Sequence, residues 1–383
     1  RTPYLIINTP SKNIMSAWYE IQNIDTLDTP ALTVFPDRVQ KNIETAIGYV
    51  DDVKRLRPHI KTHKSPDVLR LMLEAGITKF KCATIAEAEI LGAAGAPDVL
   101  LAYQPQGPKL HRFVAVMKAF PQTSYSCLAD NEKAAREMAQ VFAKASLHVP
   151  VYLDLNVGMN RTGIEPDDAA ASLYTLLTQL SGVHPAGLHA YDGHLKQPDF
   201  TERTRVCDQG FQLVEQLKAQ LLRAGLSVPT IIVGGSPGFP IHAKRKEVEC
   251  SPGTFIYWDQ GYSVLCPEQA FLPAAVLVTR IISLPAPGRV CTDLGHKSVG
   301  AEQEIIRRVH FLNASDLTPV GQSEEHLVLE APTSHHHYVG EVLYGIPYHI
   351  CPTVALYERV ITIRNGRASG EWMNSARDRK ITY

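Results

Sequence analysis

Along roughly the first two thirds of this chain, short apolar runs alternate with segments whose apolar residues recur at helical spacing. Eight short apolar runs have the composition of buried β-strands. These runs are Leu56–His63, Lys79–Ile85, Val99–Tyr103, Thr123–Leu128, Val151–Val157, Gly187–Tyr191, Ile231–Gly234 and Phe255–Trp258. Most of the intervals carry apolar residues at helical spacing: Pro66–Ala75, Ala86–Ala94, Lys109–Ala119, Glu132–Ala145, Asp167–Gln179 and Glu202–Ala224. The interval before the eighth run is short and rich in Gly and Pro, which disfavours a helix there.

Eight strands separated mostly by helices predict an α/β fold of the (β/α)8 TIM-barrel type. A doubly wound open sheet is the alternative. The barrel is favoured because polar candidate residues follow nearly every strand, and a barrel gathers such residues into one site. After Pro267 the helical stripes vanish and β-rich runs follow. We therefore predict a barrel over residues 30–266 and a mostly β domain over residues 267–383, which the N-terminal segment 1–29 joins.

Composition narrows the class of protein. The chain has 383 residues, 45% of them hydrophobic and 20% charged, with a net charge of −1. No basic run stands out, so binding to nucleic acid is disfavoured. No apolar run reaches the length of a membrane span, and no signal peptide is recognisable. The 7 cysteines are scattered and form no CxxC motif. This usage fits a reducing compartment, and we expect a cytoplasmic protein with no membrane partner.

The segment Arg57–Ser65 places two histidines and two lysines at the end of the first predicted strand. A nucleophilic lysine needs a lowered pKa, which partial burial and neighbouring cations provide. His59 and His63 are candidates for such surroundings. From this fragment alone, a reactive Lys61 or Lys64 and a basic surface loop are both open.

Two turns of small residues lie at the seventh and eighth predicted strands. Gly234, Gly235 and Ser236 follow one apolar run, and Gly253 and Thr254 lie in the other turn. Glycines and hydroxyls let a phosphate approach the backbone closely. TIM barrels often bind phosphate in the loops after these two strands. A single turn of this kind is usually only a turn, but two at these positions favour a phosphate site.

Two other strand ends offer polar groups. Arg161 lies between glycines after the fifth run and can present its guanidinium to an anionic oxygen. The sixth run ends in His189–His194, which holds two histidines, Tyr191 and a carboxylate. His194 is a candidate general base, because imidazole titrates near neutral pH. The alternatives are a solvated arginine and a strand end with satisfied histidines.

His349 and Cys351 form a candidate metal site in the second domain. On a β-strand, residues two apart point to the same face. An imidazole and a thiolate make half of a tetrahedral site, and the thiolate favours zinc over magnesium or calcium. Substrate, water or another residue must complete the shell. A buried cysteine beside a histidine is the alternative.

Nine motifs stand in the order that one enzyme family shows: RPHIKTHK, KCATIAEAE, LAYQP, DLNVGMNRTG, HAYDGH, VGGSPG, SPGTF, SEEH and PYHICPT. Each motif alone is weak. Together they make the chain similar to the D-threonine aldolase and D-serine dehydratase-like enzymes, which use pyridoxal 5'-phosphate (PLP) and have the alanine racemase fold. The resemblance covers about Asp28 to Arg364. It implies a barrel followed by a β domain, and a homodimer with sites near the subunit interface.

The resemblance also implies roles for individual residues. Lys61 would form the Schiff base with PLP, Arg161 would lie near its phenolic oxygen, and Tyr191 beside its ring. His59 would form part of the surroundings of Lys61. The phosphate would lie among the residues of the two small turns: Gly234, Gly235, Ser236, Gly253 and Thr254.

For the metal, the resemblance matches His349 and Cys351 to the ligand pair, and His194 to a base near the ion. Zinc is favoured, with manganese or magnesium as alternatives. Members of the family carry either Asp or Cys at the second ligand position. Cysteine here also suits the dehydratase branch.

These parts predict a lyase that acts on a β-hydroxy-D-amino acid. If His194 removes the hydroxyl proton, the Cα–Cβ bond breaks, and D-threonine gives glycine and acetaldehyde. If Lys61 removes the α-proton, the hydroxyl leaves, and D-serine or 3-hydroxyaspartate gives a 2-oxo acid and ammonia. We place the aldolase first, on overall resemblance. An amino-acid racemase and a non-catalytic PLP-carrier protein are further alternatives. The metal pair disfavours the racemase, and the second domain disfavours the carrier.

Overall fold

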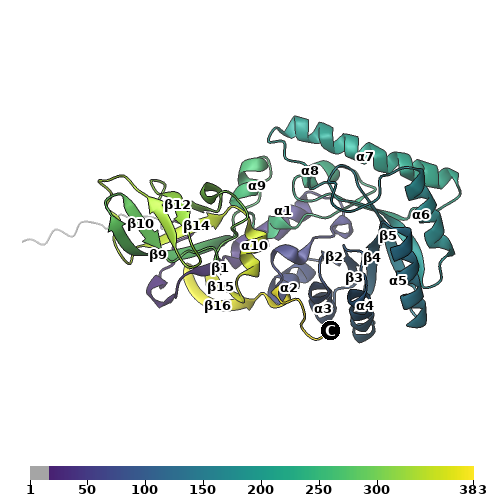
Figure 1. Cartoon of the computed structure of the whole chain (residues 1–383), viewed down its shortest axis with the longest axis horizontal. Helices are drawn as coiled ribbons and strands as arrows, with labels where there is room; N and C mark the ends of the chain where they lie inside the picture. Colours follow the sequence, from purple (N-terminus) through teal and green to yellow (C-terminus); the bar gives the residue numbers. More distant parts are fainter. Residues whose placement is uncertain (1–16) are drawn as a thin grey trace, which may run out of the picture.

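The computed structural model describes residues 17–383, which form two bodies side by side (Figure 1). One body is a parallel sheet surrounded by helices, and the other is mostly β-sheet. Helices α9 (Gln260–Leu265) and α10 (Ile350–Ala355) lie where the two bodies meet. No helix in the described residues is long and apolar enough to cross a membrane.

Seven parallel strands curl into the barrel wall in the order β2-β3-β4-β5-β6-β7-β8. They are β2 (Lys79–Cys82), β3 (Asp98–Leu101), β4 (Ser124–Ala129), β5 (Val149–Leu155), β6 (Val183–Ala190), β7 (Thr230–Val233) and β8 (Glu249–Cys250). The helices are α1 (Pro36–Gly48), α2 (Pro66–Glu74), α3 (Ile85–Ala93), α4 (Pro108–Ala119), α5 (Glu132–Lys144), α6 (Asp168–Gln179), α7 (Phe200–Arg223) and the short α8 (Phe239–His242). The predicted helices are confirmed to within a few residues at each end.

The first predicted strand, Leu56–His63, is wrong as a regular strand, although its first residues close the barrel. Leu56 bridges to β8 and His59 bridges to β2. The Arg57 N–H donates to Cys250 O at 2.9 Å, and Pro58 O accepts from Lys81 N–H at 2.9 Å. Pro58 has no N–H to extend a ladder. The chain then turns into a 3₁₀ helix, Ile60–Thr62.

The eighth predicted strand is also displaced. Phe255–Trp258 lies in and beside a 3₁₀ turn, and the strand is the two-residue β8 just before it. All four side chains of Phe255–Trp258 are buried. Burial therefore explains their apolar character, and a short apolar run does not by itself distinguish strand from helix.

The second body is built on a nine-stranded sheet, in which β12-β13-β10-β9-β1-β15-β16 form the main path. Its strands are β1 (Ala31–Val34), β9 (Ala275–Ala286), β10 (Arg289–Thr292), β11 (Val309–Phe311), β12 (Thr318–Gln322), β13 (Leu327–Glu330), β14 (Val342–Pro347), β15 (Arg359–Arg364) and β16 (Arg367–Met373). Strand β1, which we predicted as the start of the barrel domain, pairs here with β9 and β15. The Gln22 N–H donates to Gly366 O at 2.8 Å, so part of the N-terminal segment lies on this sheet. The predicted placement of residues 1–16 lies outside the described residues.

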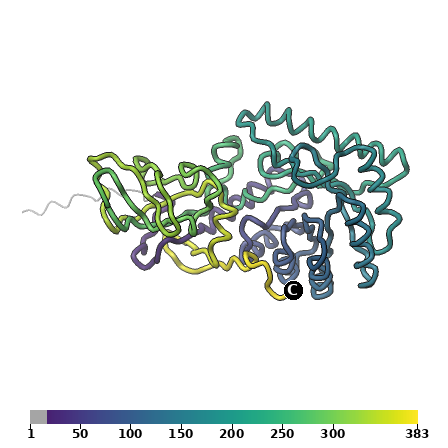
Figure 2. The backbone as a smooth tube through the Cα atoms, viewed as in Figure 1, coloured from purple at the N-terminus to yellow at the C-terminus, as the bar shows by residue number. Residues whose placement is uncertain are grey.

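Specific contacts fix the start of the longest barrel helix and the C-terminal tail. Asp199 is the N-cap of α7, and its carboxylate accepts from Glu202 N–H at 2.7 Å. The helix buries one face against the core. The C-terminal tail returns from the β domain to the barrel and ends beside α3 and α4 (Figure 2). There Arg112 Nε donates to Tyr383 O at 2.8 Å, and Thr382 N–H donates to the carboxylate of Glu89 at 3.1 Å.

Candidate active site

Lys61 borders a cavity of about 460 Å³ at the carboxyl ends of the barrel strands. The residue lies in the 3₁₀ turn, and its backbone N–H donates to His59 Nδ1 at 3.2 Å. Arg161, Tyr191 and His189 border the same cavity. Three residues far apart in the sequence, Lys61, Arg161 and Tyr191, are thus brought together as the resemblance implies.

The structure separates Lys61 from Lys64. The Lys64 ammonium donates to the carboxylate of Glu87, which is fully buried and also accepts from Ala83 N–H at 2.6 Å. Within residues 17–383 no hydrogen bond or ion pair engages Lys61 Nζ, which lies 5.8 Å from the centroid of the Tyr191 ring. Lys64 therefore pairs with a buried carboxylate, and of these two lysines Lys61 is the one whose amine stays free.

Tyr191 is surrounded by cations. Arg161 Cζ lies 4.8 Å from its ring centroid, and Lys81 Nζ lies 5.7 Å from it. Lys81 is 3% exposed, and burial lowers its pKa to about 7, against the opposing charge of Asp154. The sequence interpretation missed Lys81. Its signal was a charged residue near the end of a four-residue strand whose last three residues are buried.

His189 is a second residue that sequence reasoning did not single out. Its Nδ1 lies 2.6 Å from the Asp154 carboxylate. Burial, followed by the charge of Lys81, lowers the pKa of His189, so the ring is neutral at pH 7. The carboxylate then accepts from Nδ1–H, and Nε2 keeps its lone pair. His189 Nε2 is buried and has no partner in the described residues, which leaves it available to a ligand in the cavity.

The two turns of small residues meet each other beside Tyr191 and His59, which border this cavity. Thr254 N–H donates to Ser236 Oγ at 3.3 Å, which joins the turns. A Cβ at Gly235 would lie 2.8 Å from Tyr191 Cε2, and one at Gly253 would lie 3.1 Å from His59 O. Gly234 has φ +77°, a conformation that favours glycine. The turns therefore approach the ring of Tyr191 and the turn of Lys61 as closely as their glycines allow.

His349 and Cys351 do not lie on a strand, which corrects the sequence prediction. Strand β14 ends at Pro347, His349 caps α10, and Cys351 lies in its first turn. Pro352, in this first turn, is tolerated because the N–H groups there have no partner within the helix. The two side chains are nevertheless close enough for each to shift the pKa of the other.

The pair lies against the turn that carries Lys61. Cys351 Sγ is 3.2 Å from Thr62 Oγ1. Burial raises the pKa of Cys351, but the hydrogen bond from His349 and the charge of Lys61 outweigh it, so this pKa is lowered. Burial lowers the pKa of His349, but its contacts with Cys351 and Glu302 outweigh it and raise the pKa to about 9. A thiolate beside an imidazole is a donor set that suits zinc.

Asp259 fixes the backbone of this metal-type pair to the barrel. Its carboxylate accepts from Ile350 N–H at 3.0 Å and from Tyr262 N–H at 2.9 Å. Gly261 N–H donates to Tyr348 O at 3.0 Å. A second cavity of about 690 Å³ opens here, and its lining includes His349 and Asp259. The junction of the two bodies therefore gives solvent access to His349.

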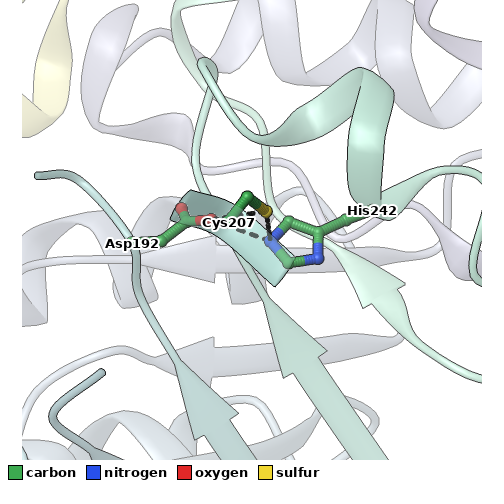
Figure 3. A group of neighbouring side chains, drawn as sticks. All are labelled: Asp192, Cys207 and His242. Carbon is green, nitrogen blue, oxygen red and sulfur yellow. Dashed lines mark hydrogen bonds and ion pairs between the residues drawn. The ribbon is translucent and has the colours of Figure 1, made fainter. Parts of the chain in front are cut away.

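A second group with metal-type donors lies in the barrel domain, where the loop after β6 meets α7 and α8: Asp192, Cys207 and His242, whose donor atoms all lie within 4.8 Å of one another (Figure 3). His242 Nε2 contacts both the Asp192 carboxylate, at 2.7 Å, and Cys207 Sγ, at 3.3 Å. Arg245 Nη1 lies 2.7 Å from His242 Nδ1. The guanidinium can only donate, so Nδ1 accepts and Nε2 carries the proton that Asp192 accepts. These are the contacts of a hydrogen-bond network, with no imidazole lone pair left over.

His194 lies near this network. A Cβ at Gly158 would lie 2.7 Å from His194 Nε2, so the ring packs on that glycine. His194 Nδ1 is buried without a partner in the described residues. The ring borders a cavity of about 10 Å³ with Asp192, Cys207 and His242. Across the described residues, no hydrogen bond joins His194 to Lys61, His349 or Cys351, and its role as a base stays a prediction.

A curled parallel sheet with a lysine at the mouth of its cavity, followed by a β domain, is the architecture of the alanine racemase class of PLP enzymes. Residues 34–260 match the family described as alanine racemase, N-terminal domain, and residues 274–363 match the putative serine dehydratase domain. The first match spans more than half of the chain, which therefore belongs to the alanine racemase N-terminal domain family.

Individual relatives narrow the comparison to lyases. A D-threonine aldolase from Arthrobacter sp. is 28% identical over 92% of this chain and 93% of the relative. A D-threo-3-hydroxyaspartate dehydratase from Delftia sp. (strain HT23) is 26% identical over 87% and 93%. The crystal structure of a D-threonine aldolase from Filomicrobium marinum superposes with a TM-score of 0.84 at 26% identity, covering 91% of this chain and 95% of that one. Aldolases and dehydratases thus share the whole architecture of this chain.

Proposed function

We propose that this protein is a PLP- and divalent-metal-dependent lyase acting on β-hydroxy-D-amino acids, with D-threonine aldolase activity as its main reaction. The observation that carries the proposal is the contact of the His349–Cys351 pair with the turn of Lys61, through Cys351 Sγ and Thr62 Oγ1 at 3.2 Å. A metal held by this pair would lie beside the reactive amine. The similarity to D-threonine aldolases along nearly the whole chain supports this reaction.

The residues around the 460 Å³ cavity fit PLP. Lys61 would hold it covalently, Arg161 would face its phenolic oxygen, and Tyr191 would lie beside its ring. His189 borders this cavity, and its buried Nε2 has no partner in the described residues, so it could bind a polar group of the cofactor. PLP supplies an electron sink for the negative charge left at Cα when a bond to that atom breaks.

The two joined turns would hold the phosphate, since Ser236 and Thr254 offer hydroxyls and their glycines allow a close approach. One amide of the cradle is not free. Gly235 N–H donates to the Asp192 carboxylate at 3.1 Å. Asp192 therefore shapes the cradle, and Ser236, Gly253 and Thr254 remain to bind the anion.

The chemistry of the donor set also fits a metal at His349 and Cys351. A thiolate and an imidazole favour zinc, with manganese or magnesium as alternatives. A bound cation would act as a Lewis acid on the β-hydroxyl of the substrate. A cysteine-to-alanine mutant of a D-threo-3-hydroxyaspartate dehydratase with this fold, TM-score 0.78 and 22% identity over 91% of this chain and 98% of that one, is described in a metal-free form. That description supports the search for a metal at a cysteine.

Two residues would carry protons. In aldol cleavage His194 would take the β-hydroxyl proton while the Cα–Cβ bond breaks, releasing acetaldehyde and leaving glycine. In dehydration Lys61 would take the α-proton while the hydroxyl leaves as water, and water would then hydrolyse the released unsaturated amino acid, so that D-threonine gives 2-oxobutanoate and ammonia. The free amine of Lys61 borders the cavity, and the buried Nδ1 of His194 is unpaired in the described residues.

Dehydration of 3-hydroxyaspartate is the second candidate function, and two observations favour it. Cys351 is the ligand type that suits the dehydratase branch. Lys196 and Arg307 border the junction cavity beside His349, where they could attract a second carboxylate. Both residues are exposed, and neither forms a side-chain ion pair in the described residues. We propose a homodimer for either reaction.

Product identification tests the proposal. The purified protein should show PLP absorbance and convert D-threonine to glycine and acetaldehyde, measured separately from 2-oxobutanoate. Lys61→Ala should abolish turnover, whereas Lys118→Ala, an exposed lysine of α4, should not. Turnover that survives both Lys61→Ala and metal chelation would exclude this mechanism. Formation of 2-oxobutanoate alone, or faster turnover of D-threo-3-hydroxyaspartate with ammonia release, would establish the second candidate.

A further inference from the structure

We infer that Glu302 is the positioning residue of the metal-binding histidine: it holds the His349 ring with Nε2 directed to the ion that Cys351 also binds. This inference rests on the metal site of the proposed function. Glu302 belongs to the loop between β10 and β11, in none of the nine motifs that carry the family resemblance.

The contact between the two side chains fixes the tautomer. His349 Nδ1 lies 2.5 Å from Glu302 Oε1. An ionised carboxylate can only accept, so Nδ1 carries a proton and keeps it, and Nε2 is the nitrogen that would bind a cation as that cation displaces the Nε2 proton. Metal-binding histidines usually donate their other ring N–H to such a partner. Both side chains are 42% exposed, so the ring would be free to rotate toward solvent without this partner.

The loop that delivers Glu302 is attached to the same helical turn as His349. Gly300 N–H donates to Thr353 Oγ1 at 3.0 Å, and this hydroxyl donates to His349 O at 2.9 Å. A Cβ at Gly300 would lie 2.9 Å from Pro352 Cγ. Glycine is therefore needed for the loop to approach so closely. An ordinary surface ion pair has no such backbone attachment on both sides.

The backbone and the ring of His349 are thus held by different groups. Asp259 and Gly261 bind the backbone of residues 348–350 to the barrel. Glu302 contacts only the imidazole. Loss of Glu302 should therefore leave the helix and the Cys351 thiol in place and release the orientation of one ring.

Zinc affinity of the PLP-loaded protein tests this division. The dissociation constant is measured by competition with a chromophoric chelator. Glu302→Ala should weaken zinc binding about 10- to 100-fold, the range found when such partners are removed. Glu302→Gln should lose less, because its amide oxygen still accepts from Nδ1–H. Glu304→Ala is the matched control, since Glu304 lies on the same loop and its side chain has no hydrogen bond or ion pair in the described residues; its affinity should not change.

Cobalt spectra separate positioning from ligation. At saturating Co²⁺, Glu302→Ala should keep the thiolate-to-cobalt charge-transfer band and shift the d–d bands, because Cys351 stays bound while the imidazole moves. Loss of all binding, as expected for His349→Ala, would make Glu302 a ligand and overturn the positioning role. Wild-type affinity in Glu302→Ala, with binding lost in His349→Ala, would overturn this inference alone. Unchanged binding in both His349→Ala and Cys351→Ala would overturn the proposed metal site and this inference with it.

Discussion

Two groups of side chains in this protein each combine a carboxylate, an imidazole and a thiol. The barrel cluster is Asp192, Cys207 and His242, and the junction cluster is Glu302, His349 and Cys351. In the barrel cluster both imidazole nitrogens are engaged, by Asp192 on one side and Arg245 on the other. In the junction cluster Glu302 engages only Nδ1 of the imidazole.

The pKa values of the two thiols differ as well. Burial raises the pKa of Cys207 to about 12, and the nearby Asp192 charge adds to the effect. The pKa of Cys351 is lowered, because its hydrogen bond with His349 outweighs burial. Proximity alone therefore does not identify a metal site, although the barrel cluster has three donors within 4.8 Å. A lowered thiol pKa, and an imidazole that only one carboxylate holds and only at Nδ1, distinguish the junction cluster.

Removal of a thiol from each cluster should give the largest difference between them. Cys351→Ala should lose bound zinc and about 10³-fold in kcat for D-threonine, since a Lewis-acid metal contributes several kcal/mol to the transition state. The PLP absorbance should remain, because Lys61 and the phosphate turns are intact. Zinc content by atomic emission, PLP absorbance and kcat are measured on the same preparations.

Cys207→Ala is the matched control for this experiment, and it should keep zinc, absorbance and most activity. If Cys207→Ala lost zinc and Cys351→Ala kept it, the metal site would be the barrel cluster and not the junction cluster. Loss of PLP from Cys351→Ala would instead point to a structural cysteine.

Removal of the carboxylate should reduce the free energy of unfolding more in the barrel cluster than in the junction cluster. This order is the reverse of the one expected for zinc binding and activity. Asp192 is 5% exposed and accepts hydrogen bonds from His242 and Gly235. Asp192→Ala leaves the buried Gly235 N–H without an acceptor and the His242 Nε2–H with only Cys207 Sγ, so the free energy of unfolding should fall by about 2–4 kcal/mol. Glu302→Ala removes a half-exposed partner and should cost less than about 1 kcal/mol.

Urea denaturation of the two variants, monitored by far-UV circular dichroism, measures this difference. Asp192→Asn should lie between Asp192→Ala and the wild type, because its side-chain oxygen can still accept from Gly235 N–H. Equal losses in Asp192→Ala and Glu302→Ala would remove the distinction between a structural and a functional cluster.

The barrel and its helices could be predicted because amphipathic spacing records burial directly. Helices α2 to α7 begin and end within a few residues of their predicted bounds. The errors fall at segments whose burial does not reveal their backbone hydrogen-bond partners. Phe255–Trp258 is buried without being a strand. Strand β1 is buried on both faces, and its sequence does not say that it pairs across 240 residues with β9.

The site shows the same limit. The motifs selected Lys61 and the pair His349–Cys351, and the pair meets even though its secondary structure was predicted wrongly. Lys81 opens the motif KCATIAEAE, where a charged residue in a buried strand was a signal that could have been used. Glu302 has no such signal, since it is 47 residues from His349 and reaches it through tertiary contacts. A single sequence contains no local signal for such a contact.

Alkylation should distinguish Cys207 from Cys351, because the labelling of the first should depend on pH and that of the second on bound metal. Because burial raises the pKa of Cys207 to about 12, its neutral thiol should react slowly with iodoacetamide from pH 7 to about pH 10, and faster only as the pH approaches its pKa. Chelation should increase labelling of Cys351 about tenfold or more by releasing its sulfur. Peptide mass spectrometry with and without chelator measures both. Chelation-dependent labelling of Cys207 would contradict the assignment of the metal to the junction cluster.

Serine substitution at the same two positions should give the smallest effect, and the most specific one. Cys207 Sγ lies 3.7 Å from Asp192 Oδ2, and a serine there keeps an O–H donor in nearly the same volume. Cys207→Ser should change the free energy of unfolding by no more than about 1 kcal/mol, with zinc content unchanged. Cys351→Ser should also fold normally, but it should lose zinc affinity, because a neutral hydroxyl is a poor substitute for a thiolate ligand. Thermal denaturation and zinc competition on the two variants test the pair. A Cys207→Ser variant with normal folding and weakened zinc binding would show that the buried network itself contributes a ligand.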